Sequence, residues 1–454
     1  MKGLIQTIRN IWKIDELRTR IVTTLVLILI YRMGSYIVLP GVNPNVLALN
    51  SQSSSNSLLG LINTFAGGAF SRASIFALGI MPYISASIVI QLLGIAVPYF
   101  QKLQKEGDSG RQKLNQLTRM LTVGITALQA VGFLINLKSS SPNAIVPIMD
   151  PNAMSMTMFM LTNVVILTTG TMFVMWLGEK IQDKGIGNGI SIIIMVGIMA
   201  RFPHALLGEV ESRMSQQGGG LVVFLIEIVA LYMTILAVVA LVQGTRRIPV
   251  QYAKRVVGNR QYGGVRQFLP LKVNSAGVMP IIFAQAIMFI PSTIAQFFPG
   301  STAWEGIGRA LINDGNLFYN SLFAFLIIAF TYFYTAVTVN PTQIGDELKK
   351  NGGFIPGVKP GASTSEYIDS VISRITLPGA IFLAFVAIFP SIARKMGVET
   401  QFAYFYGGTS LLIMVGVILD TLQQIESHLL MRHYDGLVKS GRIKGRSSIA
   451  GATS

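Results

Sequence analysis

The sequence predicts an all-α, multi-pass membrane protein with ten transmembrane helices. Its 454 residues are 51% hydrophobic and only 12% charged, which is about half the charged share of a soluble domain. Ten apolar runs come close to the length of about 20 residues that a helix needs to cross the hydrocarbon core. The chain has no cysteine and three histidines. We therefore expect no disulfide framework, no cysteine nucleophile and no metal centre. We also expect no cofactor and no catalytic residue, since no motif for either is found in the sequence.

The predicted spans follow one another along nearly the whole chain. They are 21–39, 74–97, 119–137, 153–178, 188–201, 220–243, 273–298, 317–339, 371–391 and 402–422. The first run could be taken for a signal peptide, because Lys13, Arg18 and Arg20 precede it. No small-residue cleavage site follows it, so we interpret it as a retained helix.

The distribution of charge predicts the orientation. Ten spans place both termini on one side, and that side carries 28 of the 36 Lys and Arg residues with 13 of the 20 acidic ones. Its net charge is therefore +15, against +1 on the other side. Because positive charge near helix ends is retained in the cytoplasm, we expect both termini there.

One apolar stretch, 58–97, is too long for one span and too short for an ordinary hairpin. Gly67 and Gly68 interrupt it, and Leu59–Ala66 before the break cannot cross a bilayer. Two interpretations remain open. The segment is either an amphipathic helix on the membrane surface or a re-entrant segment that fills a cavity inside the protein.

The connection 243–272 holds seven positive residues and no acidic one. Such an excess indicates an anionic partner, either a phosphate backbone or an acidic protein. Binding to anionic lipid headgroups is the alternative. A second connection, 340–370, is rich in Gly and Pro turns, which is typical of a protruding loop.

Ionisable residues inside the spans are few: Arg32, Glu227 and Asp420. Glu227 is either a carboxylate packed against another helix or a proton carrier, and a secondary transporter with a midplane site is the alternative function. A membrane-embedded hydrolase would need a zinc motif or a nucleophile with a histidine partner, and no such pattern occurs. No nucleotide-binding P-loop occurs either, so energy for transport would come from partners.

Ten motifs in register, between about residues 15 and 445, are similar to those of the SecY family, the central subunits of the Sec protein-conducting channel. They include SRASIFALGIMPYISASIVIQLL (71–93), KEGDSGRQKLNQLTR (105–119), TGTMFVMWLGEKI (169–181), GIGNGISIII (185–194), RRIPVQYAKR (246–255), LPLKVNSAGVMP (269–280), NPTQIGDELKKNGGFIPGVKPG (340–361) and FYGGTSLLI (405–413).

The resemblance implies two pseudo-symmetric, inverted five-helix halves around a central pore with a re-entrant plug helix. The implied units are a cytoplasmic segment 1–20, a first half 21–201 with the plug at about 58–73, an extracytoplasmic hinge connection 202–219, a second half 220–422, docking loops 243–272 and 340–370, and a cytoplasmic tail 423–454.

The resemblance also implies four sets of functional residues. The pore ring is Ile80, Ile84, Ile194, Ile282 and Ile413, and the plug includes Leu61, Asn63, Thr64, Phe65, Gly67 and Gly68. The lateral gate is Ser85, Gln91, Gln129 and Asn274, and partners are bound by Arg246, Arg247, Lys254, Arg255, Arg260 and Lys359.

The implied function is passage of unfolded secretory polypeptides across the cytoplasmic membrane of a bacterium, with lateral release of transmembrane segments into lipid. The implied partners are the SecE and SecG subunits, the SecA motor ATPase, the ribosome, signal sequences, nascent polypeptides and membrane lipids.

Overall fold

The computed structural model describes residues 12, 14–50, 63–146, 155–214, 220–252, 255–257, 260–262, 266–297 and 316–439. Ten long helices occur in these residues, one at each predicted span. They are α2 (Asp15–Gly34), α5 (Met81–Ala96), α7 (Asp108–Ser140), α9 (Met156–Lys184), α10 (Gly189–Met214), α11 (Gly220–Gln243), α12 (Met279–Phe297), α14 (Leu317–Thr338), α16 (Ala362–Lys395) and α18 (Gly408–Lys439). The protein is therefore the polytopic helical membrane protein that the sequence predicts.

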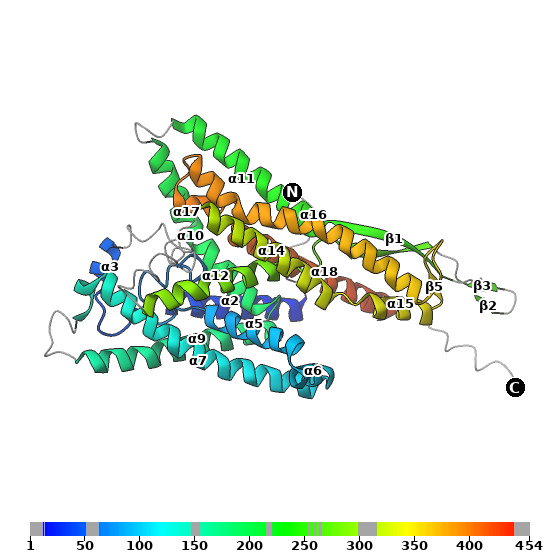
Figure 1. Ribbon diagram of the computed structural model, residues 1–454, viewed down its shortest axis with the longest axis horizontal. Helices are drawn as coiled ribbons and strands as arrows, with labels where there is room; N and C mark the ends of the chain where they lie inside the picture. Colours follow the sequence, from blue (N-terminus) through cyan, green and yellow to red (C-terminus); the bar gives the residue numbers. More distant parts are fainter. Residues whose placement is uncertain are drawn as a thin grey trace.

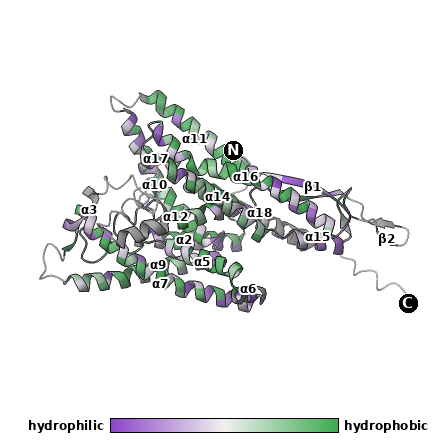
Figure 2. Cartoon of the chain, in the orientation of Figure 1, coloured by the Kyte–Doolittle hydropathy of each residue, from purple (hydrophilic) through white to green (hydrophobic). Residues whose placement is uncertain are grey.

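Length and composition differ among these helices. In the described part of the chain, seven helical segments are long and apolar enough to cross a membrane by themselves. The helix α5 is followed directly by α6 (Pro98–Lys105), with a bend of 103° between them. The bend falls at Val97, which is extended, and at Pro98, which starts α6. Figure 2 shows the long helices mostly green, which marks them as hydrophobic, whereas strand β1 (Thr245–Tyr252) is purple.

The second predicted span, 74–97, is helical only from Met81 onward. Residues 75–80 form consecutive turns, and Ser74 pairs with Val38 in an isolated β-bridge. Gly79 has a φ of +55°, a left-handed conformation that ends helical propagation. The 16 residues of α5 cover only about 24 Å, which is shorter than the hydrocarbon core of about 30 Å.

The fifth predicted span, 188–201, is too short. The helix α10 runs from Gly189 to Met214 and passes through Pro203. Proline inside a membrane helix is tolerated where neighbouring helices satisfy the released backbone groups. The predicted hinge connection 202–219 is therefore helical as far as Met214.

The ten helices form two groups that follow the chain. Figure 1 shows the blue-to-cyan helices α5, α7 and α9 in the lower part of the view and the later helices α11, α14 and α16 in the upper part. The groups contact each other along two seams. In one, α10 contacts α11, α17 (Thr400–Ala403) and α18; in the other, α12 contacts α5 and α7.

A small β-structure accompanies the helices at one end of the molecule. β1 pairs antiparallel with β4 (Arg266–Lys272) and with β5 (Gly353–Phe354), while β2 (Arg255–Val257) pairs with β3 (Arg260–Tyr262). The sheet thus joins the connections 243–272 and 340–370, which we predicted to be two separate loops. Figure 1 shows these strands beside α15 (Pro341–Lys350), while α3 (Pro44–Asn50) lies at the opposite end.

Candidate pore, plug and lateral gate

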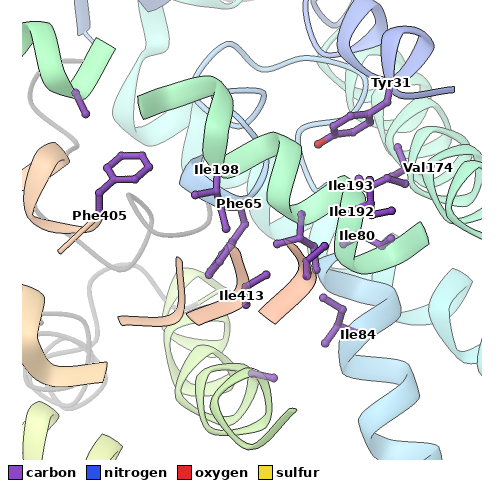
Figure 3. Close-up of a cluster of buried hydrophobic side chains, with 14 of the residues drawn as sticks. Tyr31, Phe65, Ile80, Ile84, Val174, Ile192, Ile193, Ile198, Phe405 and Ile413 are labelled. Carbon is purple, nitrogen blue, oxygen red and sulfur yellow. The ribbon is translucent and has the colours of Figure 1, made fainter. Parts of the chain in front are cut away.

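Four of the five isoleucines assigned to the pore ring line one small cavity. The cavity, of about 20 Å³, is bounded by Phe65, Met81, Ile84, Ile194, Ile282, Gln285 and Ile413. The fifth isoleucine, Ile80, belongs to the same apolar cluster and precedes α5 by one residue. Figure 3 shows Ile84 on α5, Ile80 near the start of that helix, and Ile413 and Phe65 among the other buried side chains of the cluster.

The ring is assembled from four helices that are distant in sequence: α5, α10, α12 and α18. Ile84 donates its backbone N–H to the Ile80 carbonyl at 3.1 Å, so the two side chains lie one turn apart on the same face. Ile80, Ile84, Ile194 and Ile413 are buried, and Ile282 is half-buried. With a volume of about 20 Å³, the cavity is far too small to hold a polypeptide segment.

The residues assigned to the plug, from Asn63 to Ala73, form a compact folded loop that reaches the isoleucine cavity through Phe65. Asn63–Phe65 make a short helical turn, and Asn63 closes the loop with two contacts. Its backbone carbonyl accepts from Gly68 N at 2.8 Å, and its side-chain Oδ1 accepts from Ser71 N at 3.0 Å. Leu61 and the rest of 58–62 lie outside the described residues. The buried position of the loop supports the re-entrant interpretation over a helix on the membrane surface.

Backbone atoms of the plug are packed directly against neighbouring elements. Gly67 and Gly68 have φ values of +62° and +85°, which glycine adopts readily. The Gly67 carbonyl accepts from Arg72 Nη2 at 3.0 Å and from Arg32 Nη1 at 3.4 Å. Gly197 of α10 touches the plug so closely that an added Cβ would overlap the Phe65 carbonyl oxygen. Phe65 itself is 8% exposed and bounds the ring cavity.

Three of the four residues assigned to the lateral gate lie on α5 and α7, and the fourth lies in the turn before α12. They are not joined by hydrogen bonds among the described residues. Ser85 donates to the Met81 carbonyl at 3.2 Å, and Gln91 donates to Ser87 Oγ at 3.1 Å, both within α5. Gln129 is half-buried on α7. Asn274, just before α12, is 6% exposed, and its Oδ1 has no hydrogen-bond partner in the described part of the chain.

Three of the residues assigned to partner binding have described side chains, and they lie on or near the sheet. Arg246 and Arg247 on β1 and Lys359 in the second connection are exposed. Lys254 and the side chains of Arg255 and Arg260 lie outside the described residues. Because β1 pairs with both β4 and β5, the sheet gives the two connections one common base.

Sequence reasoning missed three residues that help to form this site. Met81 and Gln285 line the ring cavity beside the isoleucines, and Gly197 packs against the plug. Gln285 lies three residues after Ile282 on α12, so helical spacing could have indicated it. No local pattern distinguishes Gly197 from the other glycines of apolar spans.

Helices that enclose an apolar constriction, with a folded segment packed beneath it, are typical of a closed membrane channel. A sequence model of the SecY family matches residues 74–422. The chain is 41% identical over 459 aligned residues to the protein translocase subunit SecY of Chlamydia muridarum, covering 97% of this chain and 99% of the relative. The chain belongs to the SecY family.

Solved structures with the same fold include a SecY channel described for its plug domain (TM-score 0.62, 16% identity, 90% of this chain and 92% of that chain). They also include Sec61 in the canine ribosome–channel complex, with a TM-score of 0.60, 16% identity and the same coverage of both chains.

Proposed function

We propose that this chain is the pore-forming subunit of a protein-conducting channel in the cytoplasmic membrane of a bacterium. It moves unfolded secretory polypeptides across the membrane and releases transmembrane segments sideways into lipid. The observation that carries this proposal, beside family membership, is the cavity that isoleucines from four helices and Phe65 of the plug share.

Ile80, Ile84, Ile194, Ile282 and Ile413 act as a ring around the passing chain. Branched apolar side chains offer a polypeptide no hydrogen bonds and so no fixed binding site, and an apolar constriction resists wetting when it is empty. The plug closes the space beneath the ring. In one structural relative the plug domain is described as stabilising the closed state and maintaining a membrane seal, which supports the same role for residues 58–73.

Lateral release uses the seam where α12 contacts α5 and α7. Ser85, Gln91, Gln129 and Asn274 supply the polar groups of this gate. Polar contacts between helices in lipid contribute only about 0.6–2 kcal/mol where they form. No hydrogen bond joins these four side chains among the described residues, so the apolar helix of a signal sequence can separate the helices of the gate. Signal sequences, nascent polypeptides and membrane lipids therefore meet the protein at this seam.

The basic sheet surface binds the partners that drive transport. Exposed Arg246, Arg247 and Lys359, together with Lys254, Arg255 and Arg260, give it a strong positive charge. Such a surface attracts ribosomal RNA or acidic protein surfaces, and the canine Sec61 relative is in a ribosome complex. The expected partners are the ribosome and the SecA motor at this surface, with SecE and SecG as accessory subunits.

A secondary transporter is less well supported, because it needs an ionisable group at midplane that can exchange ions or protons. Glu227, the carboxylate within α11, is bound by Arg213. An enzymatic role has no support in the relatives, which are named as translocase subunits; the protein acts as a passive conduit.

The test is crosslinking of a secretory polypeptide that is stalled during transport. A photocrosslinking residue is placed in turn at Ile84, at Ile282 and at Leu225, which is 58% exposed on α11 and serves as the lipid-facing control. Adducts at Ile84 and Ile282 without adducts at Leu225 are expected. Absence of adducts at both isoleucines would refute the pore.

A further inference from the structure

The two groups of helices are held together differently at their two seams. At the α5/α7–α12 seam, the gate residues make no hydrogen bonds to one another within the described chain. At the α10 seam, on the extracytoplasmic side, charged groups pair across the boundary. The charged contacts at the α10 seam therefore resist separation of the two groups of helices, whereas the gate residues do not.

Arg213 is the centre of a buried ionic network there. Its Nε donates to Glu209 Oε1 at 2.7 Å within α10, and its Nη2 donates to Glu227 Oε1 of α11 and, at 2.6 Å, to the Gly397 carbonyl. The remaining oxygen of Glu209, Oε2, accepts from the backbone N–H of Glu399 at 2.8 Å. One guanidinium thus ties α10 to α11 and to the connection between α16 and α17.

The network is desolvated, which makes its geometry matter. The side chains of Arg213, Glu209 and Glu227 are 12%, 0% and 9% exposed. A buried ion pair is stabilising only when the geometry is good, and removal of one partner leaves an uncompensated charge. The planar fork of arginine can serve two carboxylates at once, which the single ammonium of lysine cannot do in the same way.

Three carboxylates, those of Glu209, Glu227 and Glu399, lie in the network around the single guanidinium of Arg213. Burial, and then the nearby Glu209 carboxylate, raise the pKa of Glu399. Glu227 Oε2 and Glu399 Oε2 are buried and have no hydrogen-bond partner among the described residues. The network therefore fits one relative placement of α10 and α11, because any separation of these helices would leave more of this charge uncompensated.

The position of the network suits a hinge. Arg213 is the residue before the last of α10, and Glu227 lies about two turns into α11, so the ion pair spans the connection between the two groups of helices. Opening at the α5/α7–α12 seam requires the groups to rotate about their other seam. Because the network joins the two groups at that other seam, such a rotation deforms it.

We propose that Glu209, Arg213 and Glu227 form a hinge clamp that holds the two halves of the channel in the closed arrangement and sets how strong a signal sequence must be to open it. This proposal rests on the proposed function. The three residues are positioning residues: they touch no passing polypeptide and act through the relative placement of the halves. Glu227 is thereby a structural anchor and not a proton carrier.

The test compares export of two substrates, one with an intact and one with a weakened signal sequence, by the reconstituted channel complex. The variants are Glu227→Gln, which removes one charge, and Arg213→Lys, which keeps the charge but loses the fork. The matched control is Glu179→Gln. Glu179 pairs with Arg119 at 2.8 Å, but on α7 and α9 within one half.

We expect Glu227→Gln to raise the ratio of weakened-signal to intact-signal export at least fivefold, with a smaller rise for Arg213→Lys and none for Glu179→Gln. A variant that merely folds poorly lowers export of both substrates and leaves the ratio unchanged. Equal ratios for the parent and all three variants, at comparable amounts of assembled complex, would overturn the clamp. If the parent complex exports neither substrate, the proposed function itself fails.

Discussion

The contact between Gly197 and the plug provides a direct test of how the closed state is held. Gly197 lies in α10, and its Cα faces the backbone of the plug. A Cβ added there would overlap the Phe65 carbonyl oxygen and lie 3.3 Å from Gly67 N. Gly197→Ala therefore adds one methyl group against two peptide units that have no flexible side chain to move aside.

The size of the effect follows from the packing. Adding carbon to a well-packed site costs about 1–3 kcal/mol. The strain is released when the plug leaves its position, because the atoms nearest to the added Cβ all belong to Phe65 and Gly67 of the plug. A destabilisation of about 1–3 kcal/mol corresponds to roughly a 5- to 150-fold increase in the population with a displaced plug. Gly124→Ala in α7 is the matched control, since nothing lies within 4 Å of its added Cβ.

The assay uses the fact that the chain has no cysteine. Thr64→Cys places a single thiol in the plug at a position that is 5% exposed. A membrane-impermeant maleimide is added on the extracytoplasmic side, and its rate of reaction reports plug displacement. We expect at least fivefold faster labelling with Gly197→Ala and parent-like labelling with Gly124→Ala. Rates within twofold of each other for all three proteins would refute the packing argument.

Three further predictions concern the gate, the ring and the docking surface. In the closed gate, the buried Asn274 oxygen without a partner costs about 1–3 kcal/mol, so Asn274→Leu should stabilise the closed gate. Export of weakened-signal substrates should then fall several-fold, and unchanged export would contradict the gate assignment. Ile413→Ala should cost about 2–5 kcal/mol and make vesicles leak ions, whereas Leu412→Ala, equally buried but in another cluster, should destabilise the protein without a leak. The double variant Arg255→Glu with Arg260→Glu changes the loop charge by about four units. It should abolish motor-driven export while the channel still inserts into the membrane. Normal ATP-dependent export by this variant would exclude the docking role.

The sequence predicts the helices well because the membrane imposes a strong and local requirement. A span needs a long apolar run, and each of the ten runs contains one helix. The errors occur where tertiary contacts override composition. Residues 75–80 are apolar but turn, because Gly79 is left-handed and Ile75 N donates to the Ile37 carbonyl at 2.9 Å. The pairing of β1 with β5 was missed because its partners, such as Gln251 and Phe354, are about a hundred residues apart. The pairing of β1 with β4 is within one connection, but its many charged residues indicated a binding loop instead of a strand pair.

The functional site is less visible in the sequence. Apolar spans contain many isoleucines, and only the resemblance to the SecY family separates the ring residues from ordinary core. Gln285 could have been found from its spacing to Ile282. The contact of Gly197 with Phe65 and the pairing of Arg213 with Glu227 could not, because each depends on how helices pack across the molecule.

Two contributions to the free energy of the closed state have opposite signs: one at the gate is unfavourable, and one at the hinge is favourable. Asn274 keeps a buried, unpaired oxygen at the seam that must open, and such an atom costs about 1–3 kcal/mol as long as it remains unsatisfied. At the opposite seam, Arg213 donates to one oxygen of each of two carboxylates and to a carbonyl. An opening motion can relieve the first term but must disturb the second. Because these two terms oppose each other, we expect the free-energy difference between the closed and the open arrangement to be small enough for an entering apolar helix to reverse it.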